Sequence, residues 1–210
     1  MTAHDPARVR ITPATWITLA RLVGVFVFIL LVTYHTLDLR KGAADSVFRV
    51  WALQLFLVVA ATDFLDGWLA RRRNEITALG TFLDPVADKL LVVSSLILLT
   101  KPSLAALSPR FPVWFTWLVI SRDLYLFAGA VLVHATGVRL HIKPRLSGKL
   151  ATLLNLAAIA LVLGRAGGLP LTATLSAASA ATLLSWIQYT FDGLPQAFRH
   201  PPGPDQTSQR

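Results

Sequence analysis

The sequence has no cysteine and few charged residues. Of its 210 residues, 11 are acidic, 20 are basic and 54% are hydrophobic. The lack of cysteine excludes disulfides, thiolate nucleophiles and cysteine-ligated metal sites. A charged fraction of only 15% and a mean hydropathy of +0.59 are typical of a membrane protein rather than a soluble domain.

Apolar runs long enough to cross a bilayer as helices recur along the chain. They predict an all-α integral membrane bundle of six transmembrane helices, at about 13–36, 47–70, 82–100, 112–134, 147–164 and 171–191. This transmembrane domain should cover residues 1–198. The tail at 199–210 is rich in Pro, Gly and polar residues and should be disordered.

Basic residues are distributed unevenly over the predicted loops. If both termini lie in the cytoplasm, the cytoplasmic segments carry 11 lysines and arginines and the opposite segments carry 6. Because Lys and Arg concentrate in cytoplasmic loops, this bias predicts a multi-pass membrane protein with both termini inside. The net charge of +9 is then explained by orientation and anionic lipids, and no nucleic-acid partner is expected.

Four aspartates lie within or beside the second and third apolar runs. Asp63 and Asp66 are three residues apart and Asp84 and Asp88 are four apart, so each pair shares one face of a helix. Both pairs lie at similar distances from residue 75.5, the centre of the connecting loop. An antiparallel hairpin would bring them to one depth near the cytoplasmic end. Carboxylates at membrane depth are costly, by roughly 2.5 kcal/mol or more, and therefore indicate a functional site.

Converging carboxylates repel one another, so a positive charge must offset them. The dipole at the start of the third helix should favour Asp84 and Asp88, whereas the other pair ends a helix. Oxygen-only ligands suit Mg²⁺ or Mn²⁺, and four carboxylates are enough for two ions, an arrangement used in phosphoryl transfer. Gly67 and Gly80 leave room for a ligand near the backbone, and Arg71 can bind phosphate.

The spacing of these residues resembles a known family signature. From Asp63 to Asp88 the sequence follows D-x2-D-G-x2-A-R-x8-G-x3-D-x3-D at every fixed position. This pattern is similar to the motif of the CDP-alcohol phosphotransferases, membrane enzymes of six helices that make phospholipids. The resemblance implies transfer of a phosphatidyl group from CDP-diacylglycerol to an alcohol with release of CMP. It also suggests a homodimer.

The resemblance further implies a role for each motif position. Asp63, Asp66 and Asp84 would be metal ligands. Asp88 would complete the metal site and act as the general base on the acceptor hydroxyl. The residues that would line the cytidine diphosphate site are Asp63, Asp66, Gly67, Ala70, Arg71 and Gly80.

Residues outside the motif bear on the acceptor. The stretch LDPVADKLL resembles the branch that uses glycerol 3-phosphate, the first expected acceptor, or forms cardiolipin from phosphatidylglycerol, the second. Both acceptors carry phosphate, so candidate ligands are Arg122, Arg145 and Lys149. Arg122 with Asp123 could equally be a neutralised pair within the membrane. Arg21 in the first span either reaches the membrane surface or turns inward toward an anionic group.

Two other hypotheses dispense with phosphatidyl transfer. An ion transporter that uses buried aspartates predicts acids spread across the membrane, whereas these four lie at one end of one hairpin. It also leaves Gly67, Arg71 and Gly80 unexplained. A structural membrane protein would leave the four acids without a role. Phosphatidyl transfer accounts for the four aspartates as well as for Gly67, Arg71 and Gly80, and it is the preferred hypothesis.

Overall fold

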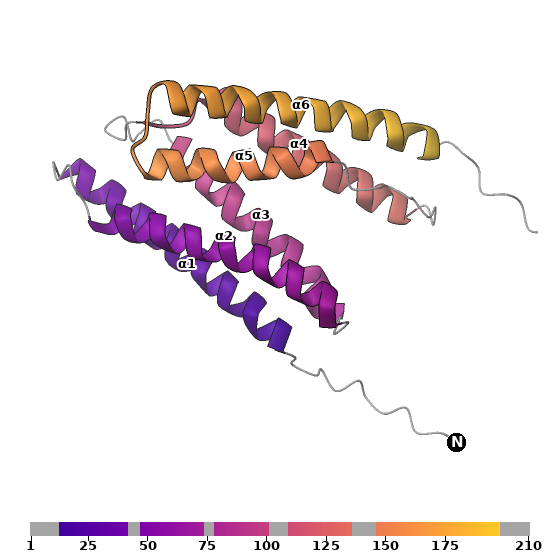
Figure 1. Ribbon diagram of the computed structural model, residues 1–210, viewed down its shortest axis with the longest axis horizontal. Helices are drawn as coiled ribbons and strands as arrows, with labels where there is room; N and C mark the ends of the chain where they lie inside the picture. The colour runs from indigo at the N-terminus through magenta and orange to yellow at the C-terminus, as the bar shows by residue number, and fades with distance from the viewer. Residues whose placement is uncertain (1–12, 42–46, 74–77, 101–108, 136–145, 198–210) are drawn as a thin grey trace, which may run out of the picture. The chain divides into compact units, whose positions relative to one another are not determined.

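The computed structural model describes the backbone of residues 13–41, 47–73, 78–100, 109–135 and 146–197, with side chains over 19–41, 47–62, 89–100, 109–129, 131 and 146–191. The described backbone forms six α-helices and no strand, so the all-α prediction is confirmed (Figure 1). The helices are α1 (Pro13–Arg40), α2 (Val47–Arg73), α3 (Ala78–Thr100), α4 (Val113–Ala135), α5 (Leu146–Leu163) and α6 (Leu169–Ala197).

The helix boundaries follow the predicted spans with two systematic differences. α1, α2 and α6 continue past their predicted ends, because their last turns carry polar residues that a hydropathy window excludes. α3 begins at Ala78, ahead of the predicted start at 82. Pro13 opens α1, a position where a missing N–H has no cost. The predicted tail at 199–210 lies outside the described residues.

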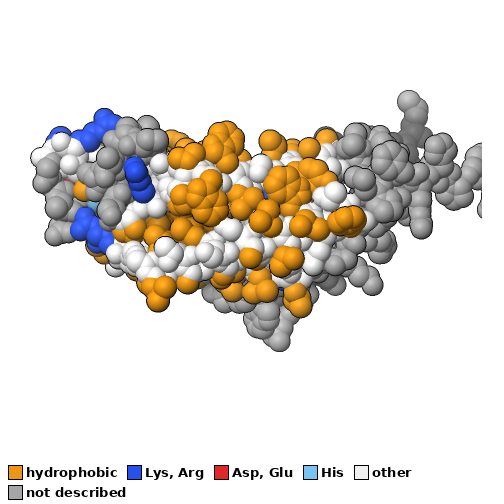
Figure 2. All heavy atoms as spheres, turned by 90° about the horizontal axis from the view of Figure 1, so that it is seen from above, with side chains coloured by type: hydrophobic (Ala, Val, Ile, Leu, Met, Phe, Trp, Pro, Cys, Tyr) orange, Lys and Arg blue, Asp and Glu red, His pale blue; other side chains and the backbone are white. Residues whose placement is uncertain are grey.

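The helix surfaces are those of a membrane protein. Within the described residues, three segments are long and apolar enough to span a bilayer, Leu19–Arg40, Leu146–Leu163 and Leu169–Phe191. Figure 2 shows hydrophobic side chains over much of one face and Lys and Arg side chains at one end. Phe26 and Trp117 are each 67% exposed. Such broad exposure of large apolar side chains is unfavourable in water and suits contact with lipid.

The described helices divide into two compact units. Unit 1 contains α1, α2, α3 and the last turn of α5, and α1 packs against both α2 and α3. The rings of Phe28 and Phe56 lie 5.9 Å apart between centroids. A Cβ placed on Gly24 would lie 3.0 Å from Cγ2 of Val59. These two pairs define an antiparallel register, in which the N-terminal part of α1 lies beside the C-terminal part of α2.

The other end of unit 1 ties α2 to α5. Tyr34 of α1 and Phe48 of α2 have ring centroids 5.6 Å apart. Nη1 of Arg49 donates a hydrogen bond of 2.6 Å to the carbonyl oxygen of Leu163, the last residue of α5. Carbonyls in the last turn of a helix lack an intrahelical donor. Arg49 therefore caps α5 from a neighbouring helix.

Unit 2 contains α4, most of α5, and α6. The ring of Tyr125 on α4 lies 5.7 Å from that of Trp186 on α6, and the hydroxyl oxygens of Tyr125 and Thr190 lie 3.1 Å apart, within hydrogen-bond distance. Arg122 of α4 contacts Ser185 of α6, and Tyr125, farther along α4, contacts Thr190, farther along α6, so these two helices run parallel. Ser147 at the start of α5 donates to Oε1 of Gln188 at 2.6 Å. The start of α5 therefore lies beside the C-terminal half of α6.

Candidate active-site residues

The helical backbone places the aspartate pairs as their spacing predicts. Asp63 and Asp66 lie in α2, and Asp84 and Asp88 lie in α3. α2 ends and α3 begins equally far from residue 75.5, so the predicted centre of the connection is correct. The aspartate side chains lie outside the described ones. Their roles as metal ligands, and that of Asp88 as base, stay predictions.

The motif positions form one stripe on each helix. Those of α2 follow the spacing i, i+3, i+4, i+7 and i+8, which repeats along one helical face. They are Asp63, Asp66, Gly67, Ala70 and Arg71. Those of α3 follow i, i+4 and i+8, namely Gly80, Asp84 and Asp88. Because the backbone is helical over both segments, residues expected to bind metal and CDP share a face on each helix.

One electrostatic prediction is wrong. α3 begins at Ala78, and its first turn contains no acidic residue. Asp84 and Asp88 lie farther along the helix, beyond the first turn to which the effect of the helix dipole is confined. Gly80, expected ahead of the helix, also lies within α3. Neither aspartate pair is stabilised by a helix N-terminus, so the need for another source of positive charge is greater than predicted.

The donor set of the two stripes suits hard divalent cations. It offers carboxylates at adjacent helical positions on α2 and α3, and neither stripe contains histidine. Mg²⁺ and Mn²⁺ prefer such oxygen ligands. Among the described side chains, no group of three His, Asp or Glu residues could hold a metal ion. The aspartates of α2 and α3 therefore remain the residues that fit a metal.

Arg21 lies in the interior of unit 1. Only 5% of its surface is exposed, which supports the inward-turned alternative and argues against a side chain extended to the membrane surface. Gly24 lies against Val59 in the antiparallel α1–α2 packing. Arg21 precedes Gly24 by three residues on α1, and Thr62 follows Val59 by three residues on α2. In this antiparallel packing, Arg21 and Thr62 therefore lie at the same level. Arg21 thus supplies a buried cation at the level where the aspartate stripe begins.

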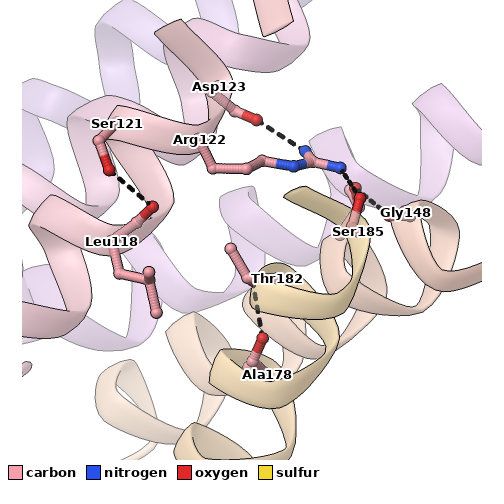
Figure 3. Close-up of polar contacts among 9 residues, drawn as sticks. Leu118, Ser121, Arg122, Asp123, Gly148, Ala178, Thr182 and Ser185 are labelled. Carbon is pink, nitrogen blue, oxygen red and sulfur yellow. Dashed lines mark hydrogen bonds and ion pairs between the residues drawn. The ribbon is translucent and has the colours of Figure 1, made fainter. Parts of the chain in front are cut away.

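Arg122 is the centre of a polar cluster in unit 2, drawn in Figure 3. Its Nη1 lies 2.8 Å from Oδ1 of Asp123, and the two side chains are 11% and 16% exposed. Its Nη2 donates to the hydroxyl oxygen of Ser185 on α6 at 2.7 Å. Arg122 is therefore neutralised by its neighbour on α4, as one alternative proposed, and is also held from a second helix.

Gly148 allows α5 to approach this cluster closely. A Cβ on Gly148 would lie 3.3 Å from Nη2 of Arg122, 3.5 Å from Oγ of Ser185 and 3.5 Å from the Tyr189 hydroxyl. Three polar atoms from α4 and α6 thus surround the position where other residues carry a side chain. We define the arginine cluster as Arg122, Asp123, Gly148, Ser185 and Tyr189.

No described contact joins the other predicted phosphate ligands to this cluster. Lys149 is exposed at the start of α5. Arg145 lies outside the described residues. Sequence reasoning missed Ser185 and Tyr189, which lie four residues apart and hence on one face of α6. Their spacing was the available signal, and the other Ser and Thr residues of α6 made it a weak one.

Comparison with known proteins identifies the chain's relatives. Residues 11–191 match the family model described as CDP-alcohol phosphatidyltransferase. The chain belongs to this family. Both the aspartate stripes and the arginine cluster fall within the matched region, so the family likeness covers all the candidate residues.

Members of the CDP-alcohol phosphatidyltransferase family with related sequences include two glycerophosphate enzymes. A "CDP-diacylglycerol--glycerol-3-phosphate 3-phosphatidyltransferase" of Bacillus subtilis is 36% identical over 58% of this chain. A "Probable phosphatidylglycerophosphate synthase" of Mycobacterium tuberculosis is 35% identical over 84% of the chain and 78% of its own length. The chain spans 61% of the length of the Bacillus protein.

A third relative is named for a different product. A "Cardiolipin synthase (CMP-forming)" of Streptomyces coelicolor is 36% identical over 52% of this chain and 46% of its own length. Similar proteins are therefore named for both phosphatidylglycerophosphate and cardiolipin synthesis. The longest of these three matches is to the phosphatidylglycerophosphate synthase.

Proposed function

We propose that this protein transfers the phosphatidyl group of CDP-diacylglycerol to glycerol 3-phosphate, forming phosphatidylglycerophosphate and releasing CMP. The observation that carries the proposal is the pair of motif stripes on α2 and α3 in a chain of this family. The names of the Bacillus and mycobacterial relatives support glycerol 3-phosphate as acceptor. The Streptomyces relative supports phosphatidylglycerol as the second candidate.

The acids of α2 and α3 bind and orient the donor in this proposal. Asp63, Asp66, Asp84 and Asp88 would hold two divalent ions, Mg²⁺ or Mn²⁺. When bound, such ions neutralise the diphosphate and the charge that develops on departing CMP. Arg71, one turn beyond Gly67 on the same stripe, would hold a phosphate of the CDP group. Gly67, Ala70 and Gly80 would give the nucleotide close access to the helix backbone.

Asp88 acts on the acceptor. Its carboxylate takes the proton of a glycerol 3-phosphate hydroxyl as that oxygen attacks the phosphorus next to diacylglycerol. A new oxygen–phosphorus bond forms, and the bond between that phosphorus and the bridging oxygen of the diphosphate breaks. CMP leaves with the bonding electron pair, and Asp88 holds the proton. No oxidant or further reactant is required.

Arg122 binds the acceptor phosphate in this proposal. Its guanidinium is partly buried, charged and already oriented by Asp123 and Ser185. A planar guanidinium forms paired hydrogen bonds with phosphate that a lysine cannot reproduce. Lys149 and Arg145 supply further positive charge near the start of α5. All these groups recognise a phosphate that glycerol 3-phosphate carries and glycerol lacks.

The membrane arrangement is part of the proposal. Six spans, with both termini and the aspartates toward the cytoplasm, would give the site access to soluble glycerol 3-phosphate. The excess of basic residues on that side supports this orientation. A homodimer is the proposed assembly, and cross-linking in membranes tests it.

An acceptor panel tests the activity. The purified protein is supplied with CDP-diacylglycerol, Mg²⁺ or Mn²⁺ and either glycerol 3-phosphate, phosphatidylglycerol or glycerol, and CMP and lipid products are measured. We expect CMP and phosphatidylglycerophosphate with glycerol 3-phosphate. Product with phosphatidylglycerol alone would assign the cardiolipin reaction instead. Release of no CMP with any acceptor would contradict phosphatidyl transfer.

A further inference from the structure

The hydroxyl of Ser185 bonds differently from those of Ser179, Thr182 and Thr190 on the same helix. Ser179, Thr182 and Thr190 each donate to the carbonyl four residues earlier on their own helix, at 2.7, 2.7 and 2.9 Å. This is the usual local bond of Ser and Thr within helices. Ser185 instead accepts a hydrogen bond from Nη2 of Arg122, on α4, at 2.7 Å. Ser185 is also completely buried.

The contacts of Arg122 leave part of its guanidinium available. Of its five N–H donors, one is directed to Asp123 and one to Ser185. Its Nε is buried and has no hydrogen-bond partner within the described part of the chain. A buried donor without a partner is costly, by about 1–3 kcal/mol. A bound phosphate oxygen would satisfy such a donor, because phosphate accepts several hydrogen bonds at once.

The two hydrogen-bond partners of the guanidinium, Asp123 and Ser185, belong to different helices. Asp123 is the next residue on α4 and neutralises the charge of Arg122 from the same helix. Ser185 belongs to α6, so its bond fixes Nη2 relative to a second helix. An arginine side chain has about 2 kcal/mol of rotamer entropy to lose. Fixing both ends of the guanidinium before the acceptor arrives removes much of this loss from binding.

Gly148 completes the arrangement from α5. The 3.3 Å distance between Nη2 of Arg122 and a Cβ at this position is shorter than an ordinary van der Waals contact. Any side chain would push the guanidinium away from Ser185 or crowd the space beside it. The lack of a side chain thus preserves the observed position of Nη2.

We propose that Ser185 is a positioning residue, which orients the guanidinium of Arg122 to bind the phosphate of the acceptor. The proposal rests on the proposed function, and specifies how the acceptor is selected. Ser185 does not touch the acceptor; it acts through Arg122. A role confined to packing would affect stability and all kinetic constants alike, whereas a positioning role affects the KM for glycerol 3-phosphate.

The test compares Ser185→Ala with Thr182→Val. Thr182 lies one turn earlier on α6, is equally buried, and bonds only to its own helix. We expect Ser185→Ala to raise the KM for glycerol 3-phosphate about tenfold, the size of a lost hydrogen bond to a charged group. The KM for CDP-diacylglycerol and kcat should change less than about twofold. Thr182→Val should leave all three constants near wild type.

A double-mutant cycle shows whether Ser185 acts through Arg122. In an Arg122→Lys background the shared hydrogen bond is lost, so adding Ser185→Ala should have no further effect on the KM for glycerol 3-phosphate. An equal tenfold effect in both backgrounds would overturn the positioning role. So would an unchanged KM in Ser185→Ala, or equal changes in Ser185→Ala and Thr182→Val.

If Ser185→Ala does not fold, Gly148→Ala on α5 provides a second test of whether the position of the Arg122 guanidinium matters. Its added methyl should raise the KM for glycerol 3-phosphate by about threefold, because Nη2 must shift only a few tenths of an ångström. An unchanged KM in a folded Gly148→Ala protein would count against the proposal. Failure of the wild-type protein to use glycerol 3-phosphate overturns the proposed function, whereas failure of the variants beside an active wild type overturns only the role of Ser185.

Discussion

In unit 1 the candidate residues follow one another within a short segment, whereas in unit 2 they come from three separate helices. Asp63 to Asp88 form two stripes on consecutive helices. The arginine cluster joins Arg122 to Ser185, 63 positions later, with Gly148 of α5 beside them. The aspartate stripes are thus set by local helix geometry, and the arginine cluster by the packing of α4, α5 and α6.

The two regions also differ in the chemistry that they offer. The stripes contain acids that need cations, and they suit a metal-bound diphosphate. The arginine cluster contains a cation already neutralised by Asp123 and still able to donate to an anion. Under the proposed function, this difference indicates separate roles, in which unit 1 binds the donor CDP-diacylglycerol and carries the base Asp88, and unit 2 selects the acceptor by its phosphate. Variants in the two regions should then alter different kinetic constants.

The largest effect is expected from Asp88→Asn. The substitution keeps the size of the side chain but removes the proposed base and one metal ligand. General-base catalysis is worth about 10²–10⁴-fold, so turnover should fall by at least about a thousandfold when a ligand is lost as well. CMP release by the purified variant measures this. Asp38→Asn on α1 is the control and should remain active, whereas near-normal turnover by Asp88→Asn would remove Asp88 from the mechanism.

The second largest effect is expected from Arg122→Lys, which tests directly whether unit 2 selects the acceptor. Lysine keeps the charge beside Asp123 but lacks the planar guanidinium that bonds both Asp123 and Ser185. We expect kcat/KM for glycerol 3-phosphate to fall about ten- to hundredfold, as for one or two lost hydrogen bonds to a charged group. Calorimetric binding of CDP-diacylglycerol should be unchanged. A parallel loss of donor affinity would contradict the assignment of separate roles.

The stripes and the arginine cluster differed in how far the sequence could predict them. Hydropathy was sufficient for the six helices, because apolar runs separated by polar loops set their positions. The aspartate stripes followed from spacings of three and four residues, which are fixed once a segment is helical. The start of α3 at Ala78 was missed because the residues before 82 are less apolar, although they continue the same helix. That error led to the wrong prediction about the helix dipole.

The arginine cluster required information that spacing does not contain. The sequence singled out Arg122 and Asp123 but left open whether they bind phosphate or only neutralise one another. The contact with Ser185 depends on the rotation and register of α4 against α6, and many registers bury the same apolar surface. The burial of Arg21 also depends on packing, because its place on α1 allowed either an inward or a surface orientation.

A third, smaller effect is expected from removing the buried positive charge of Arg21 in unit 1. Arg21 is buried at the level of Thr62, where we expect a cation to reduce repulsion among the aspartates. Arg21→Gln should therefore destabilise the metal-free protein more than the metal-loaded protein. We expect Mg²⁺ to stabilise the variant by about 2 kcal/mol more than wild type, the interaction of unit charges about 8 Å apart at an effective dielectric constant of about 20.

Thermal unfolding with and without Mg²⁺ measures the effect of Arg21→Gln. Arg49→Gln is the matched control, because Arg49 caps α5 at the opposite end of unit 1. Its loss should lower Tm equally in both conditions. An Mg²⁺-dependent shift that is the same in wild type and Arg21→Gln would show that Arg21 does not act on the aspartates.

The smallest effect on activity is expected from Gly24→Ala. This substitution lies where α1 packs against α2, away from the candidate site residues. A Cβ in Gly24→Ala would lie 3.0 Å from Cγ2 of Val59, which is itself 6% exposed and cannot move freely. Overpacking of this kind costs about 1–3 kcal/mol. Tm should fall while CMP release per folded molecule stays near wild type, because the contact of Phe28 with Phe56 still fixes the register of α1 against α2.

Two further variants make the Gly24 prediction specific. Gly24→Ala combined with Val59→Ala removes the clashing methyl, so the added Cβ should cost less in this background than in wild type. Gly129→Ala on α4 meets no atom within 4 Å. It should be neutral or stabilising by up to about 1 kcal/mol, since alanine is the better helix former. Equal destabilisation by Gly24→Ala and Gly129→Ala would contradict the close contact of Gly24 with Val59.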